Sequence, residues 1–232
     1  MKGLIFSVAL IASCPLAALA QNDTTFVADA RKNAIRYYTE SVGVQSHLFN
    51  GSEYREYISQ RDEFPYLYDD VMTGNVKYSG ELYEHIPLYY DLQKDQVITS
   101  YTHGNKVQLL RDKVEYFDIG SHRFVRLNND KVPEGFYDLL YDGKMKFYAR
   151  RIKVLAIKIN GTDADNFFEE RVKYYIVKNG TYHTVKSKRS VMNLMKDKKR
   201  EVKRVVREEN LKFGNTRETS IAKLLQRYEQ IQ

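Results

Sequence analysis

The sequence predicts an α+β protein, in which a large antiparallel sheet follows an N-terminal helix and precedes two C-terminal helices. Between about residues 71 and 185, turn-forming pairs recur roughly every ten residues and apolar residues alternate with polar ones, which is typical of antiparallel strands. On both sides of this region the apolar residues instead recur at spacings of three and four, which is the period of a helix.

The first twenty residues predict an export signal. Lys2 precedes an apolar run that is too short to span a membrane. The triplet ALA before Gln21 is typical of a secretory cleavage site, whereas the segment IASC ending at Cys14 resembles the lipobox of a lipoprotein. Because the residues after Cys14 stay apolar up to Gln21, we expect cleavage before Gln21 and assign residues 1–20 to a signal peptide. The expected location is the periplasm or the cell envelope.

The cysteine count limits the chemistry of the processed chain. Cys14 is the only cysteine, so cleavage before Gln21 leaves none. That excludes disulfides, thiol nucleophiles and thiolate metal sites. Charged residues interrupt every later apolar stretch, so we expect no transmembrane helix in the processed chain.

The net charge of +7 is unevenly distributed. Residues 186–232 carry 14 Lys or Arg against 6 Asp or Glu, whereas residues 21–185 carry 22 against 24. We therefore divide the processed chain into residues 21–185, with the first helix and the sheet, and a basic helical segment, residues 186–232, packed on the same domain.

The first predicted helix spans residues 24–45, where Val27, Ala30 and Ala34 lie at helical spacing. The sheet is then divided by turn pairs: Ser79-Gly80, Lys94-Asp95, His103-Gly104-Asn105, Gly120-Ser121, Asp142-Gly143 and Asn179-Gly180. Asp-Gly and Asn-Gly predict type I′ turns, because both central residues need a positive φ. These turns delimit about eight to ten strands, and at that number a twisted sheet tends to curl, close into a barrel or split into two layers. A barrel-like curl is therefore one expected form.

Alternation predicts which side chains point into the core. The expected inward residues are Ile86, Leu88, Tyr90, Leu92, Met145, Phe147 and Ala149, with Lys144, Lys146 and Tyr148 on the opposite face. The segment TDADNFFEE, residues 162–170, predicts a helical turn or a loop insertion instead.

Two amphipathic helices are expected after residue 185. The first carries one apolar stripe that is broken at Lys198, and the segment LKFGN ends it; the stripe consists of Val191, Leu194, Met195, Val202, Val205 and Val206. Ser187 and Ser190 precede it at positions suited to an N-cap. The last helix has Ile221, Leu224, Leu225 and Tyr228 on one face, and Asn215 with Glu218 suggests a capping box at its start.

Four segments of the chain resemble a family of exported proteins of Bacteroidota-type bacteria. They are FNGSEYREY, FPYLYDDVMTGNVKYSGELYEHIPLYYDLQKDQVIT, GFYDLLYDGKMKFYARR and YYIVKNGTYHTVKSKRSVMNLMKDKKREVKRVVREENLKF, in this order. The family has no assigned activity. The resemblance therefore implies a cell-envelope setting and assigns no catalytic residue.

Motifs for common enzyme classes are absent from the sequence. It contains no G-x-S-x-G, no phosphate-binding loop and no G-x-G-x-x-G, which argues against serine hydrolases and against ATP- or NAD-dependent enzymes. The histidines are dispersed without metal-ligand spacing, so we expect no metal and no cofactor. The densest local set is Glu81, Tyr83 and His85, which share one face if this segment is a strand. They are candidate ligand-facing residues, although a solvated strand edge explains them more simply.

An acidic band rich in tyrosine extends from Glu53 to Tyr101, and residues 53–95 hold ten acids against four bases. Paired carboxylates beside aromatic rings are used by glycoside hydrolases and by sugar-binding proteins. The simpler interpretation is that tyrosine fills half-buried strand positions with its hydroxyl in water. An envelope hydrolase acting on glycans or lipids through these carboxylates is thus the alternative function.

The segment between Lys186 and Arg207 holds ten Lys or Arg against two acids. Export argues against nucleic acid as its partner, although such runs commonly bind it. Two interpretations remain, an amphipathic helix that meets anionic lipid and a helix that packs on the sheet with a basic outer face. In either case we expect Lys198, Lys199, Lys203 and Arg207 to face anions. The favoured function is a non-catalytic envelope protein that binds a partner protein, anionic lipid or glycan.

Overall fold

The computed structural model describes residues 27–34, 37, 48, 50–56, 64–100, 105–160 and 163–231, the side chains of 160 and 163–165 excepted. The chain divides into two compact units, residues 1–43 and residues 44–232. In the first unit, residues 27–34 form the predicted helix, and all eight are exposed. The export signal, Cys14 and Gln21 lie outside the described residues, as does most of the remainder of the predicted helix.

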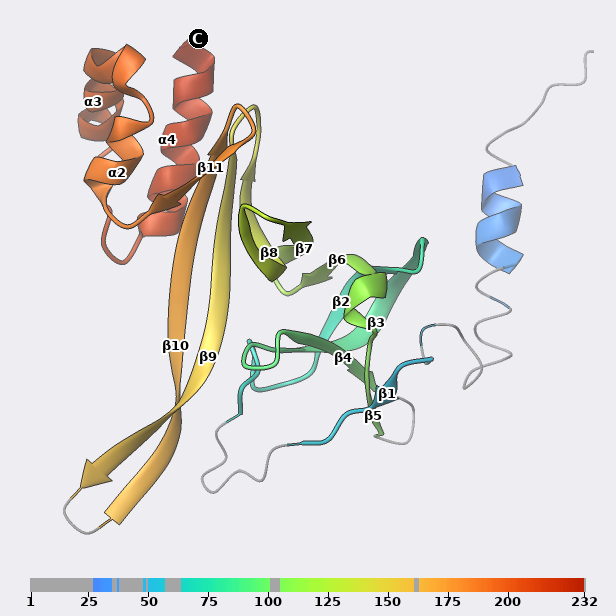
Figure 1. The fold of residues 1–232 in the computed structure, drawn as a ribbon. Coiled ribbons are helices and arrows are strands. Elements are labelled where there is room, and N and C mark those ends of the chain that lie inside the picture. The colour runs from blue at the N-terminus through green and yellow to red at the C-terminus, as the bar shows by residue number, and fades with distance from the viewer. Residues whose placement is uncertain are drawn as a thin grey trace, which may run out of the picture. The chain divides into compact units, whose positions relative to one another are not determined.

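The second unit contains one antiparallel sheet of eleven strands (Figure 1). The strands are β1 (Ser52–Glu53), β2 (Met72–Tyr78), β3 (Glu81–Asp91), β4 (Gln96–Ser100), β5 (Lys106–Gln108), β6 (Val114–Ile119), β7 (His122–Asn129), β8 (Val132–Asp142), β9 (Lys146–Asn160), β10 (Asp163–Lys178) and β11 (Thr181–Val185). Their order in the sheet is β1-β5-β4-β3-β2-β6-β7-β8-β9-β10-β11. This confirms the predicted fold class. The sheet is open, because its edge strands β1 and β11 do not pair with each other.

Most of the predicted turns join consecutive strands. Ser79 and Gly80 have φ angles of 51° and 81°, and Asn179 and Gly180 have 51° and 73°. Both pairs thus have the two positive φ angles of a type I′ turn, which match the twist of the strands they connect. Of the triplet at residues 103–105, only the last residue is described.

The predicted type I′ turn at Asp142-Gly143 is wrong. Strand β8 ends at Asp142 and β9 begins at Lys146, so three residues connect them, and neither predicted residue has a positive φ. Gly143 lies close to α4 instead, because a Cβ there would lie 2.6 Å from Glu229 Oε2. Glu229 accepts hydrogen bonds from the Met145 backbone N–H at 2.7 Å and from another side chain in this region.

The prediction of a helical turn or loop at residues 162–170 is also wrong. Strand β10 begins at Asp163, and its first eight residues pair in register with β9, from Asp163↔Asn160 to Glu170↔Lys153. Cross-strand pairing therefore overrides the local pattern, as is common where strand formation depends on a partner. Strands β9 and β10 form one long hairpin (Figure 1).

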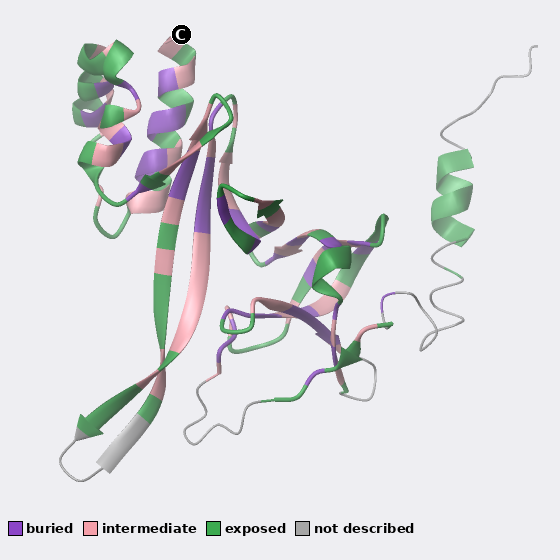
Figure 2. Ribbon diagram, viewed as in Figure 1, coloured by how far each residue is buried: buried purple, intermediate pink, exposed green. Residues whose placement is uncertain are grey.

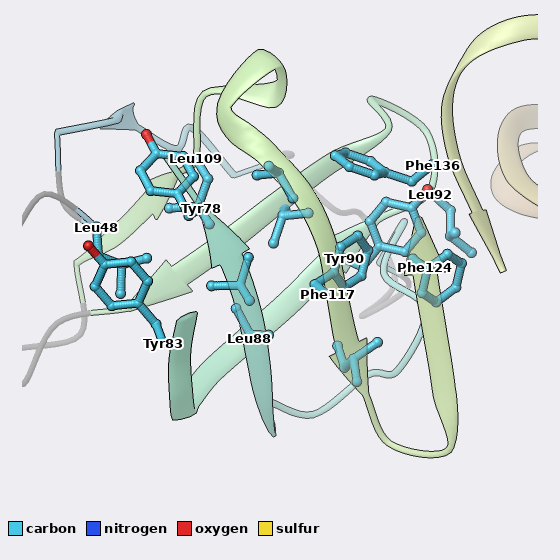
Figure 3. Packing of buried hydrophobic residues seen from close by; sticks show 14 residues of the cluster. Leu48, Tyr78, Tyr83, Leu88, Tyr90, Leu92, Leu109, Phe117, Phe124 and Phe136 are labelled. Carbon is cyan, nitrogen blue, oxygen red and sulfur yellow. The ribbon is translucent and has the colours of Figure 1, made fainter. Parts of the chain in front are cut away.

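The first core cluster lies mainly on β2, β3, β4, β6, β7 and β8 and is strongly aromatic (Figure 3). The rings of Phe117 and Phe124 stack with centroids 5.0 Å apart, and Tyr90 meets Phe117 edge-on at 5.0 Å. Leu88, Tyr90 and Leu92 are buried, as alternation predicts. Burying a side chain of this size contributes roughly 1.5–3 kcal/mol, so this cluster accounts for much of the stability of the sheet.

Next to the C-terminal helices, β8, β9 and β10 have buried residues on both faces. Met145, in the loop before β9, and Phe147, on β9, belong to a cluster that also contains residues of the C-terminal helices. Tyr148 lies on the opposite face, as alternation predicts, but it is buried there, where it packs with Tyr137 and Tyr175. A second covered face removes the polar outer positions that simple alternation predicts.

Three C-terminal helices occur where two were predicted: α2 (Lys188–Asn193), α3 (Lys199–Glu208) and α4 (Arg217–Ile231). The predicted break near Lys198 is a 3₁₀ turn, η4 (Lys196–Lys198), which separates α2 from α3. Helix α3 ends at Glu208, just before the segment LKFGN, and Asn210 after it has φ 48°. The Leu211 N–H donates to the Val206 carbonyl, and the Asn210 N–H donates to the Arg207 carbonyl. These two bonds form a Schellman motif.

Candidate anion-binding site

Local sequence explains how α2 and α3 are placed. Ser187 is the N-cap of α2, where its side chain accepts from the Ser190 N–H and Ser190 bonds back, which completes the predicted capping interaction. Val191 on α2 and Val202 on α3 are fully buried in the cluster shared with the sheet. Both helices therefore turn their apolar stripes toward β8–β11 and their polar sides outward.

An open groove of about 1110 Å³ lies between the outward sides of α2 and α3. We call it the basic groove, and its lining residues are Lys188, Arg189, Met192, Asn193, Lys196, Lys199, Lys203, Val206 and Arg207. Met192 is half-buried and Val206 is buried, whereas the six Lys and Arg residues are all exposed. The groove thus combines an apolar floor with a rim of solvated cations.

The lining of the basic groove, all of which is described, includes no acidic residue. Two nearby acids bind cations outside the lining. Glu209 lies 2.5 Å from Arg227 and 3.1 Å from Lys223, and Glu208 lies 3.8 Å from Arg204. These contacts pair Glu208 and Glu209 without involving the groove, so the six rim cations act together on whatever anion approaches.

Three of the four predicted anion-facing residues line this groove: Lys199, Lys203 and Arg207. Lys198 does not, because its Nζ donates to the Ile231 carbonyl of α4 at 3.4 Å. Sequence reasoning omitted Lys188, Arg189 and Lys196. The spacing from residue 196 through 199 and 203 to 207 follows one helix face and could have identified Lys196, whereas Lys188 and Arg189 join the groove only through the packing of α2 beside α3.

The predicted set Glu81, Tyr83 and His85 is divided by a β-bulge. Val76 pairs with Tyr83 and Gly74 pairs with Ile86, so β3 has one more residue than β2 between these pairs. His85 lies in the bulge at φ 57° and is exposed. Tyr83 is buried, and its hydroxyl donates to Glu81 at 3.0 Å. The structure therefore brings Tyr83 and Glu81 together but not His85.

Two carboxylates of the acidic band are used inside the fold. Asp91 is fully buried and accepts from the Tyr54 hydroxyl at 2.9 Å and from two backbone N–H groups of the following turn. Asp95 accepts from the Tyr90 hydroxyl at 2.6 Å. Burial and these carboxylates raise the pKa of both Tyr54 and Tyr90 above the ordinary value. Such contacts anchor the turn after β3, and the predicted hydrolase gains no support from them.

Sequence reasoning missed a buried polar network centred on Asp138 in β8. Asp138 Oδ2 lies 2.7 Å from His122 Nδ1 and 2.8 Å from the Arg151 guanidinium, which also donates to Glu218 of α4 at 2.7 Å. Burial alone would lower the pKa of Arg151, but these two carboxylates raise it above its ordinary value. A His–Asp pair can serve as a general base. Here the aspartate oxygen is shared with Arg151, so the network mainly links β7, β8, β9 and α4.

No group of three His, Cys, Asp or Glu residues in the described part of the chain could hold a metal ion. None of the helices within the described ranges is both long and apolar enough to cross a membrane. Comparison of the sequence and structure with protein-family models, curated proteins and solved structures found no match.

Proposed function

We propose that this chain is a non-catalytic, exported envelope protein that attaches to anionic lipid through the basic groove. The observation that carries the proposal is the composition of that groove, six exposed cations around an apolar floor with no acid in the lining. Lipid head groups present phosphates beside glycerol and acyl carbon atoms. A site with cations at the rim and Met192 and Val206 beneath them matches both parts of such a ligand.

The magnitude of the expected attraction is moderate. A Lys or Arg near an anionic membrane surface contributes about 1 kcal/mol. Six of them give an attraction of several kcal/mol at low salt, from which the cost of immobilising the protein is subtracted. Because the cations are exposed, the binding should weaken as salt screens them.

Lipid explains the groove better than a neutral glycan, which is another partner expected from the sequence. Neutral glycans are bound by aromatic platforms and hydrogen-bonding side chains, and the groove lining contains no aromatic residue. An acidic partner protein could use both the cations and the apolar floor, and it would not require an anionic membrane. The envelope setting rests on the predicted signal and on the family resemblance.

Sedimentation with lipid vesicles tests the proposal. The processed chain from Gln21, which carries no lipid anchor under the expected cleavage, is mixed with phosphatidylcholine vesicles that contain or lack phosphatidylglycerol. We expect binding to the anionic vesicles only. The double variant Lys199→Glu/Lys203→Glu should bind them at least about tenfold more weakly.

A matched control keeps the net charge of that variant. Lys113 and Lys144 are exposed and lie outside the groove, so Lys113→Glu/Lys144→Glu changes the charge equally. We expect this control to bind nearly as well as the unaltered chain. Equal losses in the two variants would show that only net charge matters, and the groove would then have no specific role.

A further inference from the structure

The long β9–β10 hairpin extends beyond the rest of the sheet. Strand β8 pairs with β9 only as far as Ala149, and β11 pairs with β10 only from Tyr174 onward. We call residues 150–160 and 163–173 the arm. Over this length β9 and β10 pair with each other, and no further described strand pairs with either. Figure 2 shows the hairpin changing from buried to exposed toward the free end of the arm.

On the side away from β10, no described strand pairs with β9 along the arm. The Lys153 N–H points away from β10 and donates to the Leu92 carbonyl at 3.2 Å. Backbone groups of alternate residues in an antiparallel strand point to the same side. The N–H and C=O groups of Leu155, Ile157 and Ile159 therefore also point away from β10, toward the open edge.

The same three residues carry exposed apolar side chains. Leu155 is 53% exposed, Ile157 65% and Ile159 75%. Their even spacing places them on one face of the ribbon, and Phe168, which pairs with Leu155, adds to that face. A two-stranded ribbon is marginally stable in water, and an open apolar edge is a site for pairing with another chain.

We propose that the open edge of β9 pairs antiparallel with the same edge of a second copy of this chain. The two-fold axis passes through Ile157, so Ile157 lies opposite the partner subunit's Ile157. Leu155 then lies opposite the partner subunit's Ile159. The two arms form a four-stranded sheet in the order β10-β9-β9-β10.

Two features of β9 are symmetric about Ile157, and both follow from the even spacing of residues 155, 157 and 159. In the antiparallel pair, each of the exposed apolar side chains at 155, 157 and 159 lies opposite an exposed apolar side chain of the other copy. Together they form one apolar stripe across both copies. The outward backbone groups belong to the same residues, so all three opposed pairs would be hydrogen-bonded pairs. A shift of one residue would lose both properties together, because it moves the side chains to the other face.

The charge pattern of the segment fits this register. Lys158 is the only charged residue between Val154 and Ile159, and it would lie opposite the partner subunit's Ala156 on the other face. No like charges are then directly opposed. The ladder is short, with only three opposed pairs of apolar residues, so we expect a dimer whose fraction rises with protein concentration.

This inference does not depend on the proposed lipid binding. The basic groove is formed by α2 and α3, whereas the free end of the arm lies at the other end of the hairpin (Figure 1). The groove variant Lys199→Glu/Lys203→Glu should therefore dimerise as the unaltered chain does. A failure of one proposal would leave the other standing.

Sedimentation velocity over a range of protein concentrations tests the dimer. We expect the processed chain to shift from monomer toward dimer as its concentration rises. Ile157→Lys places two like charges at the two-fold axis and should leave the monomer at all concentrations. Leu82→Lys is the matched control, since Leu82 is 47% exposed on β3 outside the arm, and it should dimerise normally.

Two further variants separate edge pairing from other contacts. Ile157→Pro removes one outward N–H and leaves the β9–β10 bonds in place, so it should also be monomeric. Ile157→Cys should form a disulfide-linked dimer on oxidation, because hydrogen-bonded pairs have Cα atoms about 5.5 Å apart. Leu82→Cys should not. A chain that stays monomeric at every concentration, or a dimer that survives Ile157→Lys, would overturn the proposal.

Discussion

Arg151 joins parts of the fold that are far apart in the sequence. Its guanidinium donates to Asp138 on β8 and to Glu218 on α4, and the Tyr174 hydroxyl also donates to Glu218, at 2.8 Å. The side chain of Arg151 is 10% exposed and that of Asp138 is 1% exposed. Removing one partner of such a pair leaves the others desolvated without compensation.

We therefore expect Arg151→Met to lower the free energy of unfolding by about 3 kcal/mol. His122 still binds Asp138 in this variant, which keeps the loss near the lower end of the range for buried pairs. Arg171 is the control, because its ion pair with Glu169 is exposed and Arg171→Met should change stability by less than about 1 kcal/mol. Urea denaturation of both variants measures the difference. Equal losses would contradict a structural role for the network.

Single residues were the hardest feature to predict. Glu218 was predicted to complete a capping box with Asn215, but α4 begins at Arg217 and Glu218 binds Arg151 instead. Nothing in the local sequence indicates this, because the partner lies 67 residues away. Lys198 and Lys199 are neighbours in the sequence, yet only Lys199 lines the groove, since their side chains leave different sides of the chain.

At the scale of elements, Asp197 connects η4 to α4 and β10. It accepts from the Tyr228 hydroxyl at 2.7 Å and lies 3.6 Å from Lys178 Nζ. The hydrogen bond from Tyr228 is the main cause that lowers the pKa of Asp197, and the charge of Lys178 adds to it. The folded state thus favours the ionised carboxylate more than the unfolded chain does.

This contact should contribute to acid sensitivity. A lowered pKa stabilises the fold above the unfolded carboxyl pKa of about 4, and this stabilisation is lost as the pH falls through the lower folded value. Asp197→Asn should therefore lose less stability between neutral pH and about pH 3 than the unaltered chain. Half of the side chain is exposed, so the difference should stay below about 1 kcal/mol. An unchanged pH profile, compared with the exposed variant Asp130→Asn, would contradict this role.

Elements were predicted well where local chemistry determines them. The turns at Ser79-Gly80 and Asn179-Gly180 follow from residues that accept positive φ, and the cap at Ser187 follows from its side chain. Residues 162–170 were predicted wrongly, because their strand conformation comes from β9 and not from their own pattern. The number of strands, eleven, also exceeds the expectation of about eight to ten.

At the scale of the whole molecule, the structure refines the charge asymmetry of the sequence. The excess positive charge of residues 186–232 is not spread evenly over the helices, since Asp197, Glu208 and Glu209 bind cations outside the groove. Six cations remain together on one side of α2 and α3. An anionic surface would therefore orient the protein with this side toward it.

The most direct test of this account is the partition of the unaltered processed chain onto vesicles at low and high salt. We predict strong binding to vesicles containing phosphatidylglycerol at low salt and no binding to pure phosphatidylcholine vesicles. The binding to the anionic vesicles should be lost as added salt shortens the screening length below about 10 Å. Equal binding to both kinds of vesicle, or binding that does not change with salt, would contradict an electrostatic lipid site in the basic groove.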